Sequence, residues 1–165
     1  MANQALENGL STMAYARQNT MAFLEDIPED KVCFQVCPGA NHALWVLGHL
    51  ATADDYFLSS IGGKEWRCDE KFKALFGMGS KPTESPSDYP RIDEIKELLH
   101  DRREALVAWF RSMSEEQLAQ PLSGDFAGFA ANHGALTSSI AWHEGLHAGQ
   151  LTVIRKALGI KPKVG

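Results

Sequence analysis

The chain has 165 residues, of which 44% are hydrophobic and 22% charged, a composition that excludes a disordered, collagenous or coiled-coil protein. Sixteen Lys and Arg residues against twenty-one Asp and Glu residues give a formal net charge of −5. This balance argues against a nucleic-acid binder or a basic membrane-surface helix, because both need a surplus of cations on one face. We therefore expect a single globular domain over residues 1–165.

The sequence also carries no targeting or membrane signal. No stretch reaches the roughly 18 uninterrupted apolar residues of a membrane span, and the first residues lack the pattern of a secretion signal. Cys33, Cys37 and Cys68 are three in number, so they cannot all pair within one chain, which favours a reducing compartment. We expect a cytoplasmic protein that binds neither nucleic acid nor membranes.

Hydrophobic residues recur at spacings of three and four, and no alternating strand pattern competes with them. The spacing predicts long helices over 3–25, 41–60, 91–113 and 132–158, and a short helix near 68–76. Asn132 is the predicted N-cap of the last helix. Because the long helices have matched lengths of roughly 30 Å, they suit a bundle. The predicted fold is all-α, a four-helix bundle with long connections between helices 1 and 2 and between helices 2 and 3.

The connection over residues 61–90 is longer than most helix–helix links in compact domains. Connections of that length are commonly functional lids or crossovers. A long connection also allows the second and third long helices to run parallel, where a short loop would make them antiparallel neighbours.

Three histidines form the most informative pattern in the chain. His143 and His147 replace aliphatic side chains in the stripe of the last helix, one turn apart, so both rings can bind a single cation. His49 comes from the middle of another helix that we expect to be buried. Buried imidazoles without partners would carry a desolvation cost of a few kcal/mol, so we predict a three-histidine metal site. Gln150 follows on the same stretch as a hydrogen-bonding partner of the site or of a substrate.

The remaining histidines fit other roles better. His42 shares a face with His49, but its place at the helix start indicates a terminal or pocket-rim residue. His100 lies in a charged stretch, which indicates the surface. His133 opens the last long helix, where a solvent-facing neighbour of the N-cap is the favoured interpretation.

The segment HEGLH also matches the H-E-x-x-H pattern of zincin proteases, in which the glutamate activates water bound to zinc. Zincins align substrates on the edge of a β-sheet, which nothing in this all-helical pattern supplies. Glu144 is rotated by about 100° from His143 on the helix, so we expect it off the bundle axis as a solvated or interface charge. We keep Glu144 as the candidate catalytic general base.

Arginines interrupt two of the apolar stripes. Arg17 and Arg102 are expected either to snorkel at a helix edge, the favoured interpretation, or to pair with a carboxylate or an anionic substrate near the metal. The large aromatic residues at helical spacing fit either the core or the lining of a pocket. They are Trp45, Tyr56, Trp109 and Trp142.

With these residues the chain resembles the DinB-like superfamily of bacterial four-helix bundles, over nearly its whole length. The specific motifs are W-x-x-x-H-L from Trp45 to Leu50 and H-x-x-x-H-x-G-Q from His143 to Gln150. The resemblance implies that His49, His143 and His147 are metal ligands. It also implies kinship with the metal-binding domain of mycothiol-dependent maleylpyruvate isomerase and with bacillithiol transferases, which use a divalent metal to activate a low-molecular-weight thiol.

Three neutral histidines leave the +2 charge of a divalent cation uncompensated and a coordination position open, as at a catalytic site. Zn²⁺ or Ni²⁺ suits imidazole best, and Fe²⁺ or Mn²⁺ also binds it. We therefore predict a metal-dependent enzyme that activates a low-molecular-weight thiol for an S-transferase or isomerase-like reaction on a small molecule. The alternatives are a hydrolase that uses metal-bound water and a non-enzymatic metal-binding module of the stress response. A homodimer through the outer faces of two helices is also expected.

Overall fold

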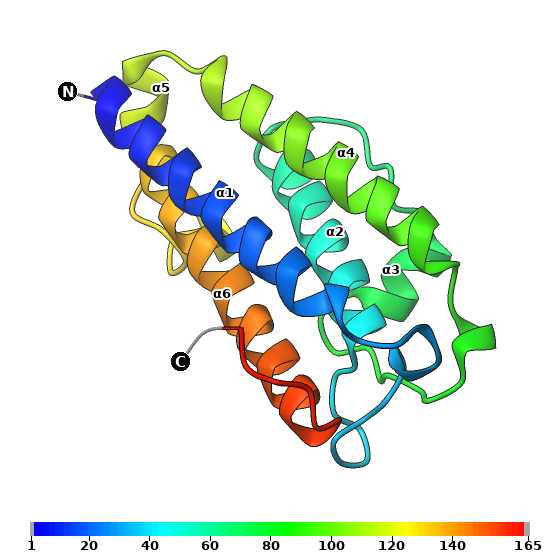
Figure 1. The fold of residues 1–165 in the computed structure, drawn as a ribbon. Coiled ribbons are helices and arrows are strands. Elements are labelled where there is room, and N and C mark those ends of the chain that lie inside the picture. Colours follow the sequence, from blue (N-terminus) through cyan, green and yellow to red (C-terminus); the bar gives the residue numbers. More distant parts are fainter. Residues whose placement is uncertain (1, 164–165) are drawn as a thin grey trace.

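The computed structural model describes residues 2–163, and this part of the chain is helical, without a β-strand (Figure 1). The four long helices are α1 (Ala2–Glu25), α2 (Ala43–Ser60), α4 (Ile92–Arg111) and α6 (His133–Ala157). Short helices occupy the connections: α3 (Glu70–Phe76), α5 (Glu115–Ala119), and the 3-10 helices η1 (Glu29–Lys31), η2 (Pro86–Asp88) and η3 (Gly124–Phe126). The all-helical class and the predicted helix near residues 68–76 are confirmed. Within the described residues, no helix is both long and apolar enough to cross a membrane.

Helix α5 was not predicted from the sequence. Its N-cap is Ser114, whose side chain accepts a hydrogen bond from the Gln117 backbone N–H while the Gln117 side chain accepts one from the Ser114 N–H. This reciprocal pair is a capping box, which satisfies two backbone donors at the helix start. The S-x-x-Q pattern was therefore the signal that could have revealed the helix.

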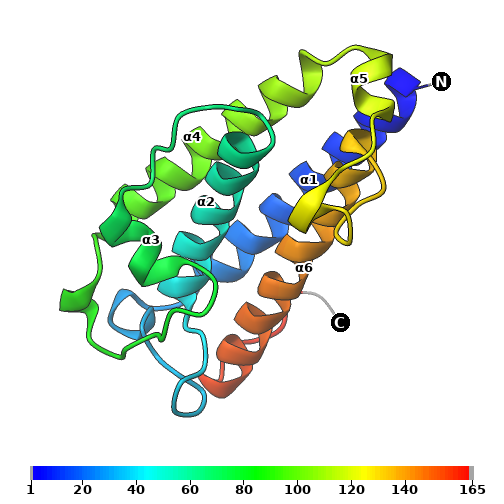
Figure 2. The same ribbon diagram turned by 180° about the vertical axis from the view of Figure 1, so that it is seen from behind.

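The long helices run in two parallel pairs. Helices α1 and α6 run in one direction and pack together, while α2 and α4 run in the opposite direction and pack together (Figures 1 and 2). The connection over residues 61–90 carries α3 and leads the chain back to the end where α2 began. The expected parallel course of α2 and α4 is thus confirmed.

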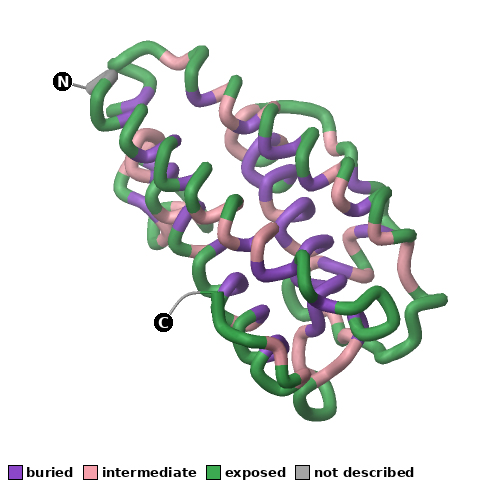
Figure 3. Tube along the Cα trace, viewed as in Figure 1, coloured by how far each residue is buried: buried purple, intermediate pink, exposed green. Residues whose placement is uncertain are grey.

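The hydrophobic core consists of two clusters, one toward each end of the long helices. Helix α2 runs through both of them and is buried along most of its length (Figure 3). One cluster contains Leu47 of α2 with Phe76 of α3, and the other contains Leu58 of α2 with Leu136 of α6. Each fully buried aliphatic side chain of this kind stabilises the fold by about 1.5–3 kcal/mol.

Side chains cap the starts of the two helices that carry the histidine motifs. Asn132 accepts a hydrogen bond from the Ala135 N–H at 2.8 Å, so its predicted role as the N-cap of α6 is confirmed. His42 caps α2, because its Nδ1 accepts a hydrogen bond from the Trp45 N–H at 3.0 Å. The His42 ring is fully buried, and its Nε2 lies 3.2 Å from the Tyr89 hydroxyl.

The cap at His42 makes stability depend on pH. Burial lowers the pKa of His42 to about 4. Above pH 6.5 the imidazole is neutral in both the folded and the unfolded chain, whereas between pH 6.5 and pH 4 only the unfolded chain takes up the proton. The free energy of unfolding should therefore fall by about 3 kcal/mol through this site as the pH drops across that window.

His42→Asn keeps a good N-cap and removes the titrating group. Urea unfolding of both proteins at pH 7 and pH 4.5 should show a smaller loss of stability in the variant. The other buried histidines titrate in both proteins, so the difference reports His42 alone. Equal losses in the two proteins would contradict the assignment.

Candidate metal centre

The three predicted histidines meet in the structure. His49 projects from the middle of α2, and His143 and His147 project from successive turns of α6. Their Nε2 atoms converge: that of His143 lies 3.3 Å from Nε2 of His49 and 3.2 Å from Nε2 of His147. One ligand atom from each residue can be chosen so that all lie within 4.8 Å of one another. This group could hold a metal ion.

Partners at Nδ1 orient two of the rings. Nδ1 of His49 lies 2.8 Å from the Phe76 carbonyl oxygen, which can only accept, so this nitrogen carries the hydrogen. Nδ1 of His147 lies 3.1 Å from Oε1 of Gln150, an oxygen that also accepts a hydrogen bond from the Asn41 side chain at 3.3 Å. Both partners leave a lone pair on the Nε2 atom that faces His143. Gln150 thus lies where the sequence placed it, beside the site.

The number of hydrogens available at the three Nε2 atoms fits a bound cation. His49 and His147 each direct an Nε2 lone pair toward His143, whose own neutral ring supplies at most one hydrogen at Nε2. Three nitrogens at these distances therefore share one hydrogen at most. A divalent cation satisfies all three lone pairs together, which is the function of such a donor set in catalytic zinc sites.

Burial keeps the rings neutral, as metal binding requires. It lowers the pKa of His49 and of His143 to about 4, and it lowers the pKa of His147 as well. The neighbouring imidazoles depress the pKa values of His49 and His143 further, because one positive charge disfavours another nearby. At neutral pH the lone pairs are available without the loss of a proton.

Helix α3 and the loop after it complete the support of His49. The Trp45 ring stacks on His49 with 4.6 Å between ring centroids and 9° between planes, and its Nε1 donates to the Ser80 hydroxyl at 2.8 Å. Gly48 lets the Phe76 ring lie directly against α2, because a Cβ at this position would overlap that ring. The absence of a side chain at Gly48 therefore allows the Phe76 carbonyl to reach His49.

The comparisons with known proteins agree with this architecture. The family model described as the DinB superfamily matches residues 12–151. The chain belongs to the DinB superfamily. The solved structure described as the conserved protein of locus from Enterococcus faecalis aligns with a TM-score of 0.63 at 19% identity, over 93% of this chain and 96% of that one, which shows a shared fold. No curated protein matches the chain.

The other histidines of this DinB-superfamily chain lie outside the group. His42 is the helix-terminal residue that the sequence predicted, although it is buried in the core. His100 is on the surface as expected, with 75% of its side chain exposed beside Glu104. His133 begins α6 and is half-buried, with Nδ1 3.0 Å from the Gln120 carbonyl oxygen, so it faces solvent less than predicted.

The environment predicted for Glu144 was wrong. Its side chain is fully buried, with Oε1 2.6 Å from Nε of Arg17 and Oε2 2.8 Å from Nη2 of Arg103. Asp54 of α2 joins the same two arginines, accepting from Arg103 at 2.8 and 2.9 Å and lying 3.2 Å from Arg17. The side of α6 that carries Glu144 faces α1 and α4 and not solvent. We call these four residues the buried charge layer.

The arginines pair with carboxylates and do not snorkel, so the favoured interpretation of Arg17 and Arg102 was wrong. Arg17 belongs to the buried charge layer and also donates to the Leu99 carbonyl oxygen at 3.0 Å. Arg102 pairs with Asp101 and with Asp55, whose Oδ1 lies 3.4 Å away. Sequence reasoning missed Arg103 and both aspartates of α2. Adjacent acids inside an otherwise apolar helix were the available signal, because buried carboxylates need cationic partners.

Removing the charge of Glu144 should destabilise the fold. Glu144→Gln leaves the two arginines with one carboxylate between them, and breaking a buried ion pair costs about 3–5 kcal/mol. Urea unfolding should show a loss of this size, whereas Glu104→Gln, an exposed partner of His100, should leave stability nearly unchanged. Equal stability of the Glu144 variant and the parent protein would contradict the inferred role of the layer.

Gly48→Ala tests the support of His49. The methyl group should displace Phe76 and with it the carbonyl that orients the ring, weakening metal affinity about 10- to 100-fold. Gly145→Ala is the matched control, because its Cβ would meet nothing within 4 Å on α6. Competition with a chromogenic chelator measures both affinities. Unchanged affinity in Gly48→Ala would exclude a supporting role for the α3 contact.

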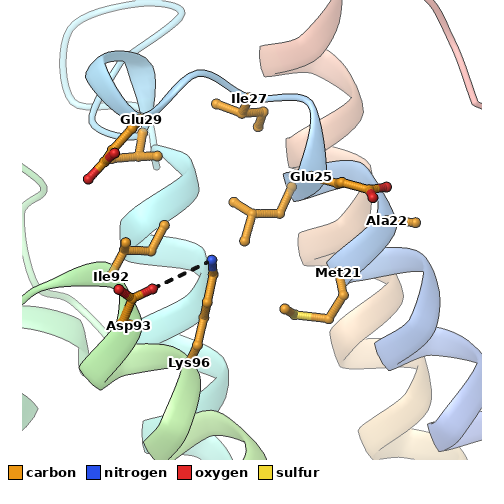
Figure 4. A pocket seen from close by; sticks show the side chains of 10 residues that line it. Met21, Ala22, Glu25, Ile27, Glu29, Ile92, Asp93 and Lys96 are labelled. Carbon is orange, nitrogen blue, oxygen red and sulfur yellow. Dashed lines mark ion pairs between the residues drawn. The ribbon is translucent and has the colours of Figure 1, made fainter.

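A hollow of about 530 Å³ lies elsewhere, between the end of α1 and the start of α4 (Figure 4). Met21 and Ile92 contribute apolar surface to it. Glu25 and Asp93 bring carboxylates to its lining, and Lys96 lies 4.0 Å from Asp93. No histidine lines this hollow, so it is separate from the candidate metal centre.

Proposed function

We propose that this chain is a divalent-metal-dependent enzyme on a four-helix-bundle scaffold that activates a low-molecular-weight thiol for transfer to a small molecule. In this proposal His49, His143 and His147 hold the metal. The observation that carries it is the convergence of three Nε2 atoms that share at most one hydrogen. Membership in the DinB superfamily is consistent with it.

The choice of metal and chemistry follows from the donor set. Three imidazoles bring no charge, and Zn²⁺ or Ni²⁺ suits them best. A divalent cation bound there would lower the pKa of a thiol or a water until the anion exists at neutral pH. The chain's own residues fix the rings: the Phe76 carbonyl holds His49, and Gln150 holds His147.

The role of Glu144 as a general base stays a prediction. Its two oxygens lie against Arg17 and Arg103, an arrangement that supports a part in positioning α6. In a positioning role, Glu144→Gln changes stability more than it changes the pH profile of turnover. The homodimer and the cytoplasmic location also stay predictions.

Metal binding is tested first. Protein purified without an affinity tag and then loaded with Zn²⁺ or Ni²⁺ should hold one equivalent by elemental analysis, and His49→Gln or His143→Gln should lose it. His100→Gln, on the surface, is the control that should keep the metal. Less than about 0.3 equivalents in both native and reconstituted protein would overturn the proposal.

The dependence of turnover on thiol is tested next. Loaded protein with a thiol should open an epoxide, displace a halide or add to an activated double bond, and this turnover should vanish in the His143→Gln variant. Hydrolysis of esters or amides without thiol would favour the metal-dependent hydrolase. Tightly bound metal with no exchangeable ligand, as judged by spectroscopy, would favour the non-enzymatic metal-binding module.

A further inference from the structure

A chain of hydrogen bonds leads from the candidate metal centre to the loop before α2. Nδ1 of His147 lies 3.1 Å from Oε1 of Gln150, and Nδ2 of Asn41 donates to the same oxygen at 3.3 Å. Asn41 and Gln150 are both half-buried, and they lie 109 positions apart in the sequence. The amide of Gln150 is therefore held between a histidine of the metal centre on one side and a loop residue on the other.

Gln150 alone cannot decide which nitrogen of His147 carries the hydrogen. The partner of His49 is a backbone carbonyl, which only accepts. The partner of His147 is a side-chain amide, which can present its oxygen or, after a half-turn about its last bond, its NH₂ group. An NH₂ group facing Nδ1 would donate to it. The hydrogen of the neutral ring would then lie on Nε2, the atom that faces the other two histidines.

Asn41 supplies the missing information. Its Nδ2 group donates to Gln150, so the Gln150 oxygen is the atom that both neighbours share. Turning the Gln150 amide alone would set two NH₂ groups against each other and lose this hydrogen bond, and only a turn of both amides together would restore it. The two amides are thereby coupled: the group that position 41 presents selects the group that Gln150 presents to His147.

The backbone around Asn41 is held on both sides. Asn41 directly precedes His42, the buried residue that caps α2. Earlier in the same loop, the Gln35 side chain donates to the Pro82 carbonyl oxygen at 3.0 Å and accepts from the Gly39 N–H at 3.2 Å. These contacts anchor the loop from which the Asn41 side chain reaches Gln150.

We infer that Asn41 is a positioning residue of the candidate metal centre. Its donor keeps the Gln150 oxygen toward His147, which keeps the hydrogen of that ring on Nδ1 and leaves the Nε2 lone pair for the metal. The inference rests on the proposed function and gives a role in it to a residue outside the ligand set. Partners of metal ligands typically change metal affinity about 10- to 100-fold.

Asn41→Asp keeps the shape of the side chain and replaces the donor by an acceptor. The Gln150 amide should then turn its NH₂ group toward both neighbours, which moves the hydrogen of His147 to Nε2. Zn²⁺ affinity, measured by competition with a chromogenic chelator, should fall about 10- to 100-fold, although the added negative charge by itself attracts a cation. Asn19→Asp is the control, because it adds the same charge at a half-buried amide of α1 that donates to the Tyr15 carbonyl oxygen. It should leave the affinity unchanged.

The tautomer of His147 can be read directly in metal-free protein. Long-range ¹H–¹⁵N correlation spectra at neutral pH distinguish a ring nitrogen that carries a hydrogen from one that carries a lone pair. The hydrogen should lie on Nδ1 of His147 in the parent protein and in Asn19→Asp, and on Nε2 in Asn41→Asp. The ring of His49, whose partner is the Phe76 carbonyl, should keep its tautomer in all three proteins.

A partner that can only accept separates positioning from simple packing. Gln150→Glu presents oxygens alone, so it should fix the hydrogen on Nδ1 of His147 whatever stands at position 41. Asn41→Ala lets the Gln150 amide take either orientation, which should weaken Zn²⁺ binding about twofold in the parent protein. The same Asn41→Ala change should leave the affinity of Gln150→Glu unaltered. A residue that only tied the loop to α6 would cost the same affinity in both backgrounds.

The outcomes separate this inference from the proposed function. An unchanged affinity and tautomer in Asn41→Asp, or an equal loss from Asn41→Ala in both backgrounds, would overturn the inference while the metal site stands. A parent protein that binds no Zn²⁺ after reconstitution would overturn the proposed function. The spectra of metal-free protein would still show whether Asn41 selects the tautomer of His147.

Discussion

The buried charge layer is the interaction on which the arrangement of the long helices depends. Each long helix contributes one member: Arg17 from α1, Asp54 from α2, Arg103 from α4 and Glu144 from α6. The layer separates the two hydrophobic clusters, and its two positive and two negative charges balance. Buried ions are costly to desolvate and are tolerated only when paired, so a slip of any helix by one turn would set a charge against aliphatic side chains. The layer thereby fixes helix register, which apolar packing alone fixes weakly.

The same helix register positions the histidines of the candidate metal centre. Glu144 and His143 are neighbours in α6, so the contacts that hold the carboxylate toward α1 and α4 also hold the imidazole toward α2. On the far side of the site, the Phe76 carbonyl fixes the ring of His49. The three nitrogens are consequently positioned by contacts made outside the group, which prepares them to bind a cation without reorganisation.

Much of this could be predicted from the sequence, and the failures have identifiable physical causes. The spacing of apolar residues predicts the long helices, and Asn132 predicts the start of α6. The pair His143 and His147, together with His49, predicts that His49 meets α6. The periodicity of a single helix shows the angle between two of its side chains but not how many helices surround it. The periodicity of α6 therefore predicted a solvated Glu144, although α1 and α4 cover the side of α6 that carries it. The Phe76 carbonyl was beyond prediction, because a backbone group leaves no mark in the sequence.

The parallel pairing of α1 with α6 has a consequence for how the chain acquires its structure. The Arg17–Glu144 contact joins residues 127 positions apart, so α1 packs against a helix that is synthesised long after it. Helical bundles built from neighbouring hairpins form mostly local contacts and fold fast, whereas distant contacts demand closure of a long loop before they stabilise anything. On the ribosome, α1 must wait for α2, α4 and the connections between them before α6 emerges. The charges of the layer stay hydrated until then, which delays their burial to the final assembly of the domain.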